Sequence, residues 1–216
     1  MIYSEYVLIC IASPILLTLL FVKGSARRYA LFFVIGMVVC LLSAYVGGFV
    51  QQVSGMDSDW VSIYASPVTE ELMKMIPLVI TLLLSAEKDA GLLPSGIALA
   101  AGFATFENCC YILSSGADVL VFILIRGLSV GIMHIVSILI LYLGLIMAER
   151  MYSRSLASVI GALSLSMTFH SLYNLLVSEP GMPSIIGYIM PTLTAVILYK
   201  PYRRLVPSLS DSYTEK

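Results

Sequence analysis

The chain has 216 residues, of which 59% are hydrophobic and only 12% are charged. Apolar runs reach the roughly 18–20 residues that a membrane-spanning helix requires, so the composition argues against a soluble fold and predicts an all-α, polytopic membrane protein of the cell membrane, embedded in the lipid bilayer. The formal net charge of −1 offers no electrostatic basis for nucleic acid as a partner.

Seven apolar runs, separated by polar or glycine- and proline-containing turns, predict about seven transmembrane helices. In chain order they cover residues 3–22, 29–50, 64–85, 92–113, 119–147, 153–177 and 185–200, and only the last is short. The first run has no basic start and no small-residue cleavage pattern before Lys23, so we expect a retained span rather than a signal peptide. No loop is long enough for a second domain. We therefore expect a single integral-membrane domain, residues 1–216, with its functional residues inside the spans.

The basic residues predict the orientation, because Lys and Arg collect in cytoplasmic loops. With seven spans, ten of the twelve Lys and Arg fall on one side of the membrane: Lys23, Arg27, Arg28, Lys88, Arg150, Arg154, Lys200, Arg203, Arg204 and Lys216. The remaining two, Lys74 and Arg126, lie within spans. The N-terminus is therefore expected outside and the C-terminus in the cytoplasm.

The third run carries three charged residues at membrane depth: Glu70, Glu71 and Lys74. Each charge costs roughly 2.5–3.5 kcal/mol near the centre of a bilayer, so such residues persist only when they are partnered or functional. Residues three and four positions apart share a helix face, so both glutamates can reach Lys74. Lys74 is interpreted as a structural counter-ion of a glutamate in preference to a catalytic amine.

The later runs hold further polar residues: Glu107, Asn108, Arg126, His134, His170 and Asn174. At a rise of about 1.5 Å per residue, Glu71, Glu107 and His170 lie about 9–10 Å below the outer ends of their helices. His134 would lie deeper, about 22 Å down, unless the first turns of its long helix project from the membrane. Arg126 can equally snorkel to the outer headgroups or join a site, and a lone intramembrane His more often bonds a neighbouring helix. The coincidence of these residues nevertheless favours one shared polar site.

Carboxylates beside imidazoles in a water-accessible membrane cavity suit hydrolysis. A glutamate can take a proton from water, while histidines either bind a metal that activates the water or hydrogen-bond the developing oxyanion. Two His and one Glu with an open fourth position suffice for catalytic zinc. We expect His134, His170 and Glu107 as the ligands of one divalent metal, with zinc the first choice, and a metal-free glutamate mechanism as the alternative. Residue chemistry alone leaves both a hydrolase and an ion-coupled carrier open.

Four segments together carry a more specific signal. They are residues 69–74 (TEELMK), residues 102–108 (GFATFEN), Arg126 followed eight residues later by His134, and residues 169–174 (FHSLYN). In order and helix placement they resemble the four motifs of the PrsW family of intramembrane proteases, over about residues 66–176. That family is related to the CAAX prenyl endopeptidase and bacteriocin-processing superfamily, whose first motif resembles EExxxR where this chain reads EExxK.

The resemblance implies an intramembrane endopeptidase that makes the first (site-1) cut in single-pass membrane proteins such as anti-sigma factors, near their extracytoplasmic side. It implies a catalytic core at about residues 64–177. The implied catalytic residues are Glu70, Glu71, Glu107, His134 and His170, supported by Lys74, Asn108, Arg126 and Asn174. One departure is Asn174, where Asp is expected in relatives, which favours a positioning role over metal ligation at this residue.

Two alternatives remain. A CAAX-type prenyl endopeptidase or a bacteriocin self-immunity protein would prefer a site open to the cytoplasm. A non-enzymatic membrane scaffold or an ion-coupled carrier would use the same polar cluster for helix packing or cation passage. A carrier often contains inverted repeats, and the sequence shows none.

Overall fold

The computed structural model describes residues 4–84, 92–116, 119–151 and 156–205, and within them the chain is helical with no strand. The seven long helices are α1 (Ser4–Thr18), α2 (Gly24–Ser54), α4 (Ser66–Leu84), α5 (Leu92–Ser115), α6 (Leu120–Met151), α7 (Leu156–Ser178) and α8 (Met182–Leu205). A short helix α3 (Ser58–Trp60) and a π-helical turn η1 (Val61–Ala65) lead into α4. The predicted all-α class is confirmed, and each apolar run corresponds to one long helix.

The predicted ends of the first and last helices were wrong. α1 ends at Thr18, and the chain then tightens into turns in which Leu19 and Leu20 donate to carbonyls three residues earlier. α8 is not short: it has 24 residues because it begins earlier and continues past Pro201. Pro183 suits the first turn of a helix, where its missing N–H would have no helical partner.

Five helices among the described residues are long and apolar enough to cross a membrane, namely α2, α5, α6, α7 and α8. Of the other two long helices, α1 is apolar but has only 15 residues, and α4 carries three charged residues in 19. The count of seven spans and the orientation of the termini therefore stay predictions.

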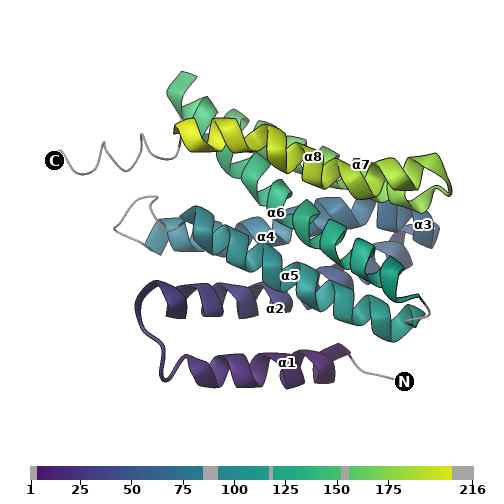
Figure 1. The fold of residues 1–216 in the computed structure, drawn as a ribbon, viewed down its shortest axis with the longest axis horizontal. Helices are drawn as coiled ribbons and strands as arrows, with labels where there is room; N and C mark the ends of the chain where they lie inside the picture. The colour runs from purple at the N-terminus through teal and green to yellow at the C-terminus, as the bar shows by residue number, and fades with distance from the viewer. Residues whose placement is uncertain (1–3, 85–91, 117–118, 152–155, 206–216) are drawn as a thin grey trace.

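The long helices lie side by side in a layered bundle (Figure 1). α1 forms one edge and packs on α2, while α7 and α8 lie at the opposite edge. α6 runs obliquely and contacts α5 as well as α7 and α8. α4 contacts α5 and α7, and α6 contacts the same two helices, so these four helices meet. These four helices carry the four predicted motifs.

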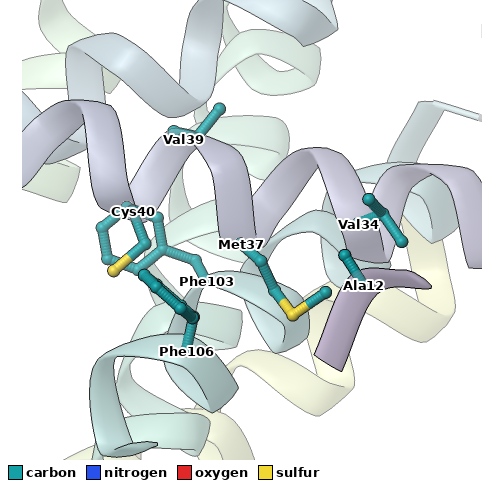
Figure 2. Close-up of a cluster of buried hydrophobic side chains, with 7 residues drawn as sticks. All are labelled: Ala12, Val34, Met37, Val39, Cys40, Phe103 and Phe106. Carbon is teal, nitrogen blue, oxygen red and sulfur yellow. The ribbon is translucent and has the colours of Figure 1, made fainter. Parts of the chain in front are cut away.

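α2 and α5 approach each other closely because each has a glycine at the contact. A Cβ on Gly36 would collide with the carbonyl oxygen of Leu99, and one on Gly102 with that of Phe33. Small residues allow this kind of close backbone approach between membrane helices. Beside the contact lies a cluster of buried apolar side chains from α1, α2 and α5 (Figure 2): Ala12, Val34, Met37, Val39, Cys40, Phe103 and Phe106. This core holds α5, and therefore its polar residues, in place.

The chain enters α4 through the π-helical turn η1. The N–H of Ser66 donates to the carbonyl of Val61, five residues earlier. With the same spacing of five residues, the carbonyl of Ser62 would accept from the N–H of residue 67. Residue 67 is a proline and has no N–H, so the Ser62 carbonyl has no donor at this spacing in its own helix. Asn174 of α7 takes this place, with Nδ2 donating to Ser62 O at 2.9 Å. α7 is thereby tied to the segment that positions the start of α4.

Candidate active site

Four helices deliver the predicted polar residues to one point of the bundle. Glu70, Glu71 and Lys74 come from α4, Glu107 from α5, His134 from α6 and His170 from α7. Glu71, Lys74, His134 and His170 are buried, whereas the side chains of Glu70 and Glu107 are 18% and 32% exposed. The cluster is therefore closed around these four side chains and partly exposed at Glu70 and Glu107.

Lys74 lies at the centre of the cluster. Its Nζ is 2.9 Å from Glu71 Oε1 and 2.7 Å from His134 Nδ1, and it lies 4.1 Å from the centroid of the Phe103 ring. A buried charge needs a partner of opposite sign and further hydrogen bonds. The structure pairs Lys74 with Glu71, and the adjacent Glu70 instead directs its Oε2 toward His170.

Glu71 connects α4 with α7. Its Oε1 accepts from Lys74 and lies 2.8 Å from His170 Nδ1, while its Oε2 lies 3.0 Å from Ser166 Oγ. His170 is thus held by one ring nitrogen, and its Nε2 faces Glu70 Oε2 at 3.8 Å. Ser166 was not predicted as a site residue, although it lies four residues before His170 and so shares its helix face.

Glu70 Oε2 is buried and has no hydrogen-bond partner among the described residues. Buried polar atoms are nearly always hydrogen-bonded, so an orphaned carboxylate oxygen calls for an explanation such as a bound water or ion. Its position opposite His170 Nε2 makes this pair the place where such a group would sit.

Glu107 connects His134 with Arg126. Its Oε2 lies 2.7 Å from His134 Nε2, and its Oε1 lies 3.5 Å from the Arg126 guanidinium. Arg126 also donates to Asn108 Oδ1 at 2.6 Å and stacks over Tyr111, 3.5 Å from the ring centroid. These contacts favour the interpretation of Arg126 as part of the site over snorkelling to the headgroups.

His134 and Glu107 are in direct contact, although their positions along their helices predicted different depths. The ring of His134 lies against Phe103, one helical turn from Glu107 on α5, with centroids 4.8 Å apart. Glu107 therefore reaches along its own helix by about one turn to meet the imidazole. Phe103 was also missed by the sequence analysis, and its position four residues before Glu107 is the signal that identifies it.

A candidate metal group is present among the described residues. Glu70, His134 and His170 each offer a ligand atom, and these atoms lie within 4.8 Å of one another. Glu70 takes the place that the sequence-based ligand set assigned to Glu107. Metal-bound His residues typically donate their other ring N–H to a carboxylate, as His170 can to Glu71. Glu70 and His170 thus fit a divalent metal, whereas both nitrogens of His134 already contact Lys74 or Glu107.

A helical bundle of apolar candidate spans around a buried carboxylate and imidazole cluster defines a multi-pass membrane protein with a site suited to hydrolysis. The family described as PrsW family intramembrane metalloprotease matches residues 24–200, so the chain belongs to this family. The resemblance seen in the four motifs is thereby confirmed. No curated protein and no solved structure matches the chain. Family membership makes this chain an intramembrane protease and a multi-pass integral membrane protein, and α1 lies outside the matched residues.

Proposed function

We propose that this protein makes the first, site-1 cut in single-pass membrane proteins such as anti-sigma factors, near their extracytoplasmic side. The observation that carries the proposal is the orphaned Glu70 Oε2 facing His170 Nε2 within a bundle of apolar helices. Membership of a family of intramembrane proteases supports hydrolysis of a peptide bond at this site. The predicted orientation, which puts the motifs in the outer halves of the spans, supports the extracytoplasmic side.

In this proposal Glu70 takes a proton from the attacking water and returns it to the leaving amine. Glu71 holds His170 through Nδ1, so that His170 Nε2 stays directed at the same water. If a divalent metal is bound instead, for which zinc is the expected ion, Glu70 Oε2 and His170 Nε2 would hold it, the metal would supply Lewis-acid activation of the water, and the other oxygen of Glu70 would be left to take the proton. Lys74 balances the charge of Glu71, and Arg126 that of Glu107.

Cleavage by the purified protein tests the proposal. Candidate single-pass substrates are co-reconstituted with the protein in vesicles, and mass spectrometry maps the cut. Glu70→Gln keeps the side-chain volume but lacks the basic oxygen, so turnover should fall at least about 100-fold. Glu5→Gln is the matched control, because Glu5 lies on α1 and bonds Tyr45 away from the site. Full turnover by Glu70→Gln, or a cut at the cytoplasmic end of the substrate, would contradict the proposal.

Elemental analysis tests the metal separately. We expect a stoichiometric transition metal in the purified protein, its loss in His170→Ala and its retention in Glu5→Gln. Metal-free protein that still cleaves substrate and resists chelators would instead identify a glutamate-type protease that uses the same Glu70.

A further inference from the structure

Lys74 determines the direction of the hydrogen bonds around it. A lysine ammonium has three N–H donors and no acceptor, so its two close partners, Glu71 Oε1 and His134 Nδ1, must both accept. A neutral imidazole that accepts through one nitrogen carries its proton on the other. His134 therefore presents Nε2–H to Glu107 Oε2, which lies 2.7 Å away.

The opposite tautomer follows for His170. The Glu71 oxygen that accepts from Lys74 also lies 2.8 Å from His170 Nδ1, and it acts as an acceptor toward both. A neutral His170 therefore carries its proton on Nδ1 and has a lone pair on Nε2, which faces Glu70. The two imidazole rings, edge to face with centroids 5.0 Å apart, thus differ in which nitrogen is protonated.

We propose that Lys74 is a positioning residue that gives the two histidines different roles. His170 offers the Nε2 lone pair that a metal ion or a water can use. His134 donates its Nε2–H to Glu107 and does not bind the metal, so the protein ligands reduce to Glu70 and His170. This inference deepens the proposed function and rests on it for its catalytic meaning.

The reverse tautomer of His134 conflicts with the packing. It would direct Nδ1–H at the Lys74 ammonium, so that two donors would face each other across 2.7 Å. Both residues are fully buried, and a buried donor without an acceptor loses its hydrogen bond to water without replacement. A doubly protonated His134 would meet the same conflict and would add a second cation beside Lys74.

The chain contains only two histidines, so isotope labelling of histidine gives ring-nitrogen NMR signals from these two residues alone. We expect metal-stripped wild-type protein to show one Nδ1–H ring and one Nε2–H ring, and His134→Gln to remove only the Nε2–H set. Lys74→Arg keeps the donors and should keep both tautomers. Lys74→Met removes the donors, so His134 should lose its preference for Nε2–H while His170 stays Nδ1–H. Zinc alone, titrated into the wild type, should shift His170 Nε2 and leave the nitrogens of His134 in place.

Two rings of the same tautomer, or direct zinc coordination by both rings, would overturn the proposal. The wild-type spectrum and its zinc titration decide the matter even where Lys74→Met does not fold. A wild-type protein that shows both tautomers but cleaves no substrate would contradict the proposed function and leave this inference standing, so the two failures are distinguishable.

Discussion

Glu70 and Glu71 are neighbours in the sequence, but the bundle gives them different environments. Adjacent residues of an α-helix point about 100° apart, so the two side chains face different neighbours. Glu71 contacts Lys74, His170 and Ser166, whereas Glu70 Oε2 has no hydrogen-bond partner among the described residues. The same substitution at the two positions should therefore have different consequences.

We expect Glu71→Gln to destabilise the protein and Glu70→Gln to leave its stability near that of the wild type. Glu71→Gln removes the counter-ion of a fully buried lysine, and breaking a buried pair in this way costs about 3–5 kcal/mol. Glu70→Gln replaces a carboxylate whose Oε2 has no hydrogen-bond partner among the described residues with a neutral group of equal size. Thermal unfolding of the two variants in detergent measures the difference. Equal loss of stability in both would show that Glu70 has a structural partner.

Local spacing indicated which polar residues share a site, but not how they pair. Glu70 and Glu71 lie four and three residues before Lys74, and either separation allows contact. The pairing seen here depends on Ser166 and His170 of α7, which hold Glu71 in place. Such contacts between distant segments leave no periodic pattern in the sequence. For this reason the sequence predicted Glu107 as a metal ligand, whereas the candidate metal group in the structure contains Glu70.

At the scale of elements, the apolar runs located all seven long helices, because a membrane span needs a long and continuous apolar run. The π-helical turn before α4 has no such signal. It depends on a contact with α7, because Pro67 has no N–H to donate to the Ser62 carbonyl. Asn174 of α7 donates to this carbonyl instead. The contact also gives a physical reason for an amide at residue 174, because a carboxylate cannot donate to a carbonyl.

Asn174→Ala should cost about 1 kcal/mol, the usual net value of one hydrogen bond, and should lower cleavage activity because the start of α4 is less well positioned. Asn174→Asp should be worse than Asn174→Ala, since it places a carboxylate against the Ser62 carbonyl. Unfolding and turnover are measured for both, with Thr168→Ala on the same helix as the control. An Asp variant as active as the wild type would mean that the amide does not act as a donor.

The contact between α2 and α5 gives a second prediction at this scale. Gly36→Ala and Gly102→Ala each place a Cβ against a backbone carbonyl of the other helix, so each should cost about 1–3 kcal/mol through overpacking. Gly48→Ala is the matched control on α2, because nothing lies within 4 Å of its added Cβ. Thermal unfolding checks this expectation. Equal midpoints for Gly36→Ala and Gly48→Ala would contradict the close approach of the two helices.

At the scale of the whole molecule, the one-sided distribution of Lys and Arg predicts the topology. A reporter fused after Lys216, or inserted within residues 86–91, should lie in the cytoplasm, and one within residues 51–59 should lie outside. Reporters that fluoresce or become enzymatically active on only one side of the membrane distinguish the cases. An external C-terminus would refute the seven-span arrangement and with it the extracytoplasmic position of the site.

The exposure of Glu107 and Glu70 bears on how the protein obtains its second reactant. Lipid tails cannot solvate a carboxylate, so we expect the partly exposed edge at these two residues to face water instead of acyl chains. Every peptide bond that is hydrolysed consumes one water molecule, and in the proposed protease this edge is its way in. A substrate segment seated across the edge would close the same entrance. Each turnover would then use water trapped before the substrate arrived, and the site would refill only after the product leaves.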